Sequence, residues 1–173
     1  MNFQVAYQEK QRPVAGLDPV YALIMADTNL GMRDRIIKLQ AAMIEAGGAE
    51  GDSLPLDHQF APGTYARTIF MPKGSFVIGK IHRRACVNII SKGRATVWTE
   101  YGEKQVEAPA VWVSDPGTQR VVLNHEDVVW TCVHQNPDNL TDMEAMEEQT
   151  ILPDYSSIPI IESEPEMQTI GGE

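Results

Sequence analysis

The sequence has few cysteines and no long apolar run. Two cysteines in 173 residues cannot form a disulfide framework, which excludes a disulfide-rich secreted domain and favours a reducing compartment such as the cytosol. The apolar run nearest the N-terminus, residues 20–26, is too short for a membrane span and lacks a basic lead. We therefore expect neither secretion nor membrane insertion.

Basic residues are absent from the C-terminal part of the chain. Residues 138–173 contain 10 acidic and no basic side chains, whereas residues 1–137 contain 14 of each, so this tail carries the whole net charge of −10. We expect the tail either to order against a partner or to act as a solvated, solubilising segment. The largest basic cluster is the pair Arg83 and Arg84, so direct nucleic-acid binding is not expected.

The length favours one domain with appendages. The sequence predicts an extended arm over residues 1–26, an amphipathic helix over 27–48, a β-barrel over 49–137, and a short helix with an acidic tail over 138–173. The apolar stripe of the first helix consists of Met32, Ile36, Leu39 and Met43. This stripe predicts packing either on the chain's own sheet or on another subunit.

Between residues 65 and 134 the composition predicts short strands separated by turns. The predicted strands cover residues 66–71, 75–82, 86–91, 94–100, 103–107, 110–114, 118–124 and 127–134. Eight strands without intervening helices predict a mainly β sandwich or small barrel. Residues 49–64, with Pro55 and Pro62, are expected to form a loop. Thr141 and Glu144 have capping-box spacing, which predicts a short helix reaching about Gln149.

Three segments carry a family resemblance: Gly79–His82, Asn88–Gly93 and Ser114–Arg120. They resemble the two signature segments of the cupin superfamily, which implies a double-stranded β-helix of jelly-roll type. More closely, the stretch from Arg67 to His134 resembles uncharacterised cupin-like proteins of tailed bacteriophages. That resemblance implies a virion or assembly component, found in the virion or the host cytoplasm. Such a component would act through contacts with virion proteins or as a homo-oligomer, without binding nucleic acid or a membrane.

The resemblance also identifies the positions of the usual cupin metal ligands. Three histidines and one carboxylate would occupy positions that are here Lys80, His82, Cys86 and Arg120. Protonated Lys and Arg have no lone pair for a metal ion, so the usual site for iron or manganese cannot form. We therefore assign no catalytic residue and no cofactor, and the leading interpretation is a non-enzymatic protein.

One alternative is a small-molecule binding protein. Lys80, His82 and Arg120, together with Arg67 or Arg94, would converge on an anionic metabolite in the barrel. In the competing interpretation, Arg120 only locks strands together by pairing with an acidic side chain. The candidate partners are Glu100, Glu107 and Asp115.

A second alternative is an atypical metal-dependent cupin enzyme. His82 and Cys86, with Cys132 and His134, would provide a tetrahedral set for zinc or iron. The sequence has no Cys-x-x-Cys clamp, and buried thiols with satisfied histidines would explain the same residues. A nucleophile elbow and a phosphate-binding glycine loop are both absent from the sequence.

Overall fold

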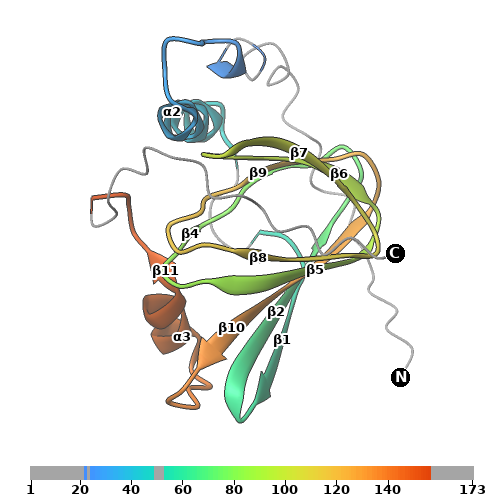
Figure 1. Ribbon diagram of the computed structural model, residues 1–173, viewed down its shortest axis with the longest axis vertical. Coiled ribbons are helices and arrows are strands. Elements are labelled where there is room, and N and C mark those ends of the chain that lie inside the picture. Colours follow the sequence, from blue (N-terminus) through green and yellow to red (C-terminus); the bar gives the residue numbers. More distant parts are fainter. Residues whose placement is uncertain (1–21, 23, 49–52, 157–173) are drawn as a thin grey trace.

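Two antiparallel sheets face each other in the computed structural model, which describes residues 22, 24–48 and 53–156 (Figure 1). The larger sheet has the order β1 (Leu56–Ala61), β2 (Gly63–Met71), β10 (Val128–Asn136), β5 (Cys86–Lys92), β8 (Ala110–Ser114). The smaller sheet has the order β3 (Phe76–Ile78), β9 (Val121–Asn124), β6 (Arg94–Thr99), β7 (Gly102–Glu107). A two-stranded pair joins β4 (Ile81–His82) to β11 (Ile151–Leu152).

The order of the strands is that of a jelly-roll barrel. From β5 onward the chain crosses repeatedly between the sheets, because β6 and β7 lie in the smaller sheet, β8 in the larger, β9 in the smaller and β10 in the larger. The predicted mainly β, cupin-like jelly-roll barrel is confirmed. Its core is apolar where the sheets face each other, and Ile90, Val122 and Trp130 are buried there.

Three predicted stretches of the barrel differ from the structure. The predicted strand 118–124 begins only at Val121, as β9. Residues 56–61 form β1 and not a loop, because Pro55 precedes the strand and Pro62 lies in the turn after it, so neither proline interrupts the ladder. The predicted strand 75–82 is divided into β3 and β4. Between them the Gly79 amide donates to the Arg120 carbonyl at 2.8 Å, and residues 79–80 leave the sheet.

Helix α2 (Met32–Glu45) packs on the smaller sheet, as Figure 1 shows. Ile36 and Leu39 are fully buried against Trp98 and Val121. The apolar stripe therefore covers the chain's own barrel, and the alternative that it docks on another subunit is wrong for its buried positions. The helix begins later than predicted because the Asp27 side chain accepts from the Asn29 amide instead of capping the helix.

The segments at the two ends of the chain are described only in part. At the end of the predicted extended arm the chain is helical, and the Ala26 amide donates to the Ala22 carbonyl at 3.0 Å. The arm before residue 22 and the acidic tail after residue 156 lie outside the described residues. The short helix is confirmed as α3 (Met143–Thr150), although Asp142 and not Thr141 caps it. No helix among the described residues is long and apolar enough to cross a membrane.

An ion pair joins α2 to the barrel. Arg33 Nη2 lies 3.6 Å from Glu100 Oε1, and the Glu100 side chain is 8% exposed. Burial raises the pKa of the Glu100 carboxyl above its usual value, against the opposing effect of the Arg33 charge. The folded protein therefore binds this proton more tightly than the unfolded chain does.

We expect the E100Q variant to show that protonation of Glu100 contributes to stability. Stability contributed by Glu100 is greatest below pH 4.5 and falls as pH rises through the folded-state pKa, because ionisation is less favourable in the folded protein. Glutamine resembles the protonated acid at every pH. The melting temperature of E100Q minus that of wild type should therefore increase from pH 4.5 to pH 7 in differential scanning fluorimetry. A difference that is constant or decreases would contradict the assignment.

Candidate functional site

A cavity of about 900 Å³ lies at one end of the barrel. Strands β2 and β10 supply Tyr65, Arg67 and His134 to its wall, and the segment around β4 supplies His82. Side chains from α2 and α3 also line it, which places the cavity between the barrel and the two helices. A volume of this size is in the range of small-molecule sites.

Arg120 is the deepest charged group of this region. Its side chain is buried, Nη2 donates to Ser114 Oγ at 2.6 Å and to Cys86 Sγ at 3.7 Å, and its guanidinium lies 5.6 Å from the centre of a Trp130 ring. The suggested pairing with Glu100, Glu107 or Asp115 does not occur among the ion pairs of the described residues. Arg120 therefore places a positive charge inside the barrel, and no carboxylate of residues 22, 24–48 or 53–156 pairs with it.

The other predicted cations lie in different surroundings. Arg67 lines the cavity and is in register with Cys132 on β10, and its charge acts on His82 and His134 as that of Arg120 does. Lys80 also lines the cavity, but its Nζ forms a 2.7 Å ion pair with Glu147 of α3 at the rim. Arg94 does not converge: it pairs with Glu126 at 3.7 Å and lies outside the cavity wall.

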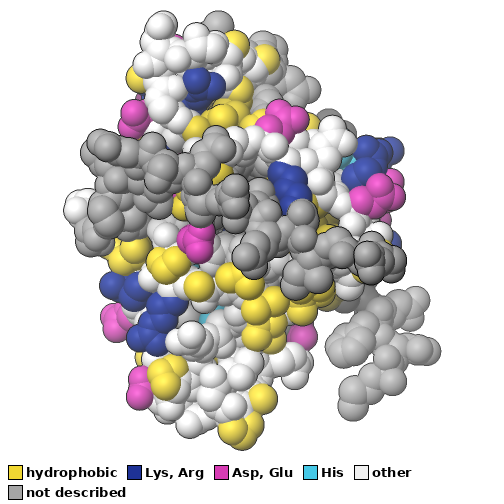
Figure 2. Space-filling view, viewed as in Figure 1, with side chains coloured by type: hydrophobic (Ala, Val, Ile, Leu, Met, Phe, Trp, Pro, Cys, Tyr) yellow, Lys and Arg dark blue, Asp and Glu magenta, His cyan; other side chains and the backbone are white. Residues whose placement is uncertain are grey.

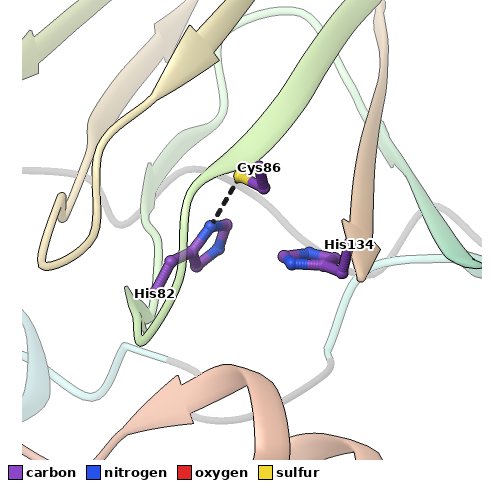
Figure 3. Close-up of side chains that lie close together, drawn as sticks. All are labelled: His82, Cys86 and His134. Carbon is purple, nitrogen blue, oxygen red and sulfur yellow. Dashed lines mark hydrogen bonds between the residues drawn. The ribbon is translucent and has the colours of Figure 1, made fainter. Parts of the chain in front are cut away.

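His82, Cys86 and His134 form a buried cluster beside Arg120. One ligand atom from each residue lies within 4.8 Å of those from the other two. Figure 3 shows the His82 ring next to the thiol, with His82 Nδ1 3.0 Å from Cys86 Sγ, and the His134 ring pointing toward the His82 ring. The rings of His82 and His134 meet edge to face, with centroids 5.0 Å apart. Three of the four predicted metal ligands are therefore brought together.

Cys132, the fourth predicted ligand, lies deeper in the barrel. Its buried thiol donates to Asn88 Oδ1 at 3.5 Å. The neighbouring Cys132 and His82 lower the pKa of the Cys86 thiol, against the opposing effect of burial, whereas Cys86 and burial raise the pKa of the Cys132 thiol. We therefore expect Cys86 to carry the thiolate of this pair.

Burial keeps both imidazoles uncharged at neutral pH. It lowers the pKa of His134 to about 4, and the neighbouring His82 acts in the same direction. It also lowers the pKa of His82, although the hydrogen bond with Cys86 opposes this shift. A neutral imidazole keeps a lone pair on one ring nitrogen, so both rings are able to ligate or to accept a proton.

Asn88 forms hydrogen bonds with several buried residues of the site, and it was not among the site residues predicted from the sequence. Its side chain is fully buried and donates to Ser114 Oγ at 2.9 Å, while its Oδ1 accepts from Trp130 Nε1 at 3.2 Å. The signal in the sequence is alternation: Cys86, Asn88 and Ile90 occupy every second position of a strand and face the interior. A polar residue between two inward positions indicates a buried hydrogen-bond network.

The cupin fold raises the question of a bound metal at the usual ligand positions. Those positions do not fit one, because Lys80 is held in an ion pair with Glu147 and Arg120 donates hydrogen bonds as a cation. Only His82 retains the usual ligand type. His134 reaches the cluster from β10, outside that set of positions.

Comparison with known proteins gives matches among solved structures. No family model and no curated protein matches the sequence. Among solved structures, a cupin 2 conserved barrel domain protein from Salinispora arenicola has a TM-score of 0.44 and 14% identity, covering 56% of this chain and 87% of that one. Ectoine synthase from P. lautus has a TM-score of 0.47 and 11% identity, covering 66% and 88%. A cupin domain from Bordetella pertussis has a TM-score of 0.41 and 14% identity, covering 51% and 99%.

Proposed function

We propose that the protein binds a small anionic molecule, carrying a carboxylate or phosphate group, in the barrel cavity. One observation carries this proposal: the described residues that line the cavity include four cations and one acid. The cations are Arg67, Lys73, Lys80 and Arg120, and the acid is Glu147. In a chain whose net charge is −10, a cavity with this composition concentrates positive potential where an anion would enter.

The two arginines suit recognition of a planar anion. Arg67 lies on β2 and Arg120 lies inside the barrel, and a guanidinium donates two parallel hydrogen bonds to a carboxylate or phosphate. Lys80 at the rim is half-exposed, and its ion pair with Glu147 is of the weakly stabilising surface kind. An entering anion therefore replaces Glu147 as the partner of Lys80 at a small cost in free energy.

The remaining wall of the cavity accepts an apolar part of the ligand. Its methionines are Met43, Met71, Met143 and Met146, and they come from the barrel and from both helices. Unbranched thioether side chains adapt to ligands of irregular shape. The expected ligand is therefore amphipathic, with an anionic group toward Arg67 and Arg120 and an apolar group toward the helices.

Ligand screening by thermal shift and calorimetry tests this function. Against a panel of carboxylates and sugar phosphates, a ligand present at 100 times its Kd should stabilise the wild type by about 2.7 kcal/mol. R67Q should weaken the calorimetric affinity for the same ligand at least about tenfold, because a charge-assisted pair is lost. K92Q, at an exposed position outside the cavity wall, is the matched control. Equal affinities of R67Q and K92Q, or no stabilising anion in the panel, would contradict the proposal.

We also propose a role in protein contacts, as a virion or assembly component of a tailed bacteriophage. The resemblance to cupin-like phage proteins motivates it, and exposed valines on β8, the last strand of the larger sheet, support it: Val111 is 68% and Val113 62% exposed. Hydrophobic side chains are also exposed on the face shown in Figure 2, beside Lys and Arg side chains near α3. Mass spectrometry of purified particles from the source tests this role, and absence of the chain from them would contradict it.

A further inference from the structure

The buried Arg120 guanidinium requires a counter-charge inside the barrel. Its side chain is 6% exposed, and its Nε has no hydrogen-bond partner among the described residues. A buried charge without an opposite charge nearby is strongly destabilising. The described residues that accept hydrogen bonds from Arg120 are Ser114, at 2.6 Å, and Cys86, at 3.7 Å. Of these two, only the Cys86 thiol is acidic enough to carry a negative charge in a protein.

Further donors surround the Cys86 sulfur. His82 Nδ1 lies 3.0 Å from it, and Asn88 Nδ2 lies 3.8 Å from it (Figure 3). Burial lowers the pKa of His82, so this ring is uncharged and donates to the sulfur in the tautomer with its proton on Nδ1. A neighbouring cation and hydrogen bonds to the charged form both favour a thiolate. Cys86 and Arg120 therefore form a buried ion pair.

Cys132, the other buried thiol, lies in different surroundings. Its thiol donates to Asn88 Oδ1 at 3.5 Å, and Cys86 and burial both raise its pKa. In the pairing of β10 with β5, Cys132 is opposite Asn88 and therefore diagonal to Cys86. Diagonal neighbours lie about 7–8 Å apart, whereas the Cα atoms of an unstrained disulfide are about 4.4–6.8 Å apart. Cys132 therefore remains a protonated thiol and does not bridge to Cys86.

The cavity provides a route to the Cys86 sulfur for very small molecules only. Cys86 is 3% exposed, so bulky reagents do not reach it. His82 and Arg120, which both contact the sulfur, line the cavity. Hydrogen peroxide is little larger than water and therefore reaches the sulfur between these side chains.

We propose that Cys86 is a site of oxidation by hydrogen peroxide, which converts it to a sulfenic acid while Cys132 stays reduced. The thiolate sulfur attacks one peroxide oxygen, so a sulfur–oxygen bond forms and the oxygen–oxygen bond breaks. Two electrons pass from the sulfur to the peroxide, and the other oxygen leaves as hydroxide, which a proton from the buffer converts to water. This site goes beyond the proposed anion binding and does not depend on it.

Labelling of the full-length protein with dimedone, which adds to sulfenic acids, tests the site. The protein is reduced, transferred to a buffer with chelator to exclude metal-catalysed oxidation, and treated at pH 7 with one equivalent of hydrogen peroxide and excess dimedone. Peptide mass spectrometry should find the label at Cys86, formed at least about ten times faster than at Cys132, because only Cys86 has a stabilised thiolate. An unlabelled Cys86, faster labelling of Cys132, or a disulfide in place of the label would overturn the proposal. Calorimetry measures anion binding separately.

Variants of Arg120 test the counter-charge. R120Q removes the cation, which should raise the pKa of the Cys86 thiol toward its usual value, where only a few per cent is ionised at pH 7. Labelling should therefore be at least about tenfold slower than in the wild type. R120K keeps a positive charge and should retain most of the wild-type rate. The matched control is R94Q, because Arg94 pairs with Glu126 at 3.7 Å outside the cavity wall, and its rate should equal that of the wild type.

Circular dichroism establishes that each variant is folded. Where R120Q is not folded, R120K and C86S provide the test: R120K should be labelled at a rate close to that of R94Q, and C86S should take up no label. Equal rates in folded R120Q and R94Q, or loss of labelling in folded R120K, would overturn the ion pair with Arg120. Label in C86S would overturn the assignment of the oxidised residue.

Discussion

The G93A variant should be strongly destabilised. Gly93 forms the turn between β5 and β6 with φ +86°, a region where residues with a Cβ are strained. A Cβ at this position would clash with the Asp127 carbonyl oxygen, so the backbone before β10 must move. We expect a loss of about 4 kcal/mol or more, combining left-handed strain with displaced backbone, and a melting temperature lower by about 10 °C or more.

The matched control is G74A. Gly74 has φ +76°, but a Cβ there would meet no atom within 4 Å, so its cost is backbone strain alone, about 1 kcal/mol. Urea denaturation of both variants separates the cost of backbone strain from the cost of the contact with Asp127. Similar losses in the two variants would mean that the contact of Gly93 with Asp127 does not constrain the barrel.

Local chemistry explains why so much of the barrel was predictable. Turn signals such as Lys92-Gly93 and Pro116-Gly117 lie between strands, and Gly93 and Gly117 both adopt positive φ. Apolar periodicity likewise identified α2, because Ile36 and Leu39 had to face a core. The short β4–β11 pair has no such local signal, since it depends on a segment returning after α3.

The candidate site was predictable only where residues are close in sequence. The spacing of His82 and Cys86 indicated one face, and so did that of Cys132 and His134. Which of these residues meet depends on the register of β10 against β5, which shifts at a bulge between Val129 and Trp130. A shift of one residue turns every side chain to the opposite face, and sequence alone did not determine it.

Lys80 shows the limit of carrying a position over from a family. Its place in the signature segment predicted a side chain inside the barrel or at its mouth. The structure breaks the strand at residues 79–80, and Lys80 reaches Glu147 on α3 at 2.7 Å. The family position therefore predicted where Lys80 lies but not that it pairs with Glu147, because α3 is distant from Lys80 in the sequence.

The N88A variant should destabilise the protein through its site. Asn88 is fully buried and joins Ser114, Trp130 and Cys132 by side-chain hydrogen bonds. Alanine leaves the Trp130 N–H without its acceptor inside the barrel, and a stranded buried polar group costs about 1–3 kcal/mol. With the loss of its other hydrogen bonds, we expect about 3 kcal/mol and a melting temperature lower by about 10 °C.

The neighbouring V87A variant distinguishes the loss of the Asn88 hydrogen bonds from the general cost of placing alanine in this strand. Val87 lies on the same strand but faces outward and is 36% exposed, so its truncation should cost less than about 1 kcal/mol. Urea denaturation of both variants measures the difference in their free energies of unfolding. A loss in N88A no larger than in V87A would show that water replaces the missing hydrogen bonds. Asn88 would then position Cys132 and Trp130 without stabilising the barrel, because buried water satisfies polar groups about as well as a side chain does.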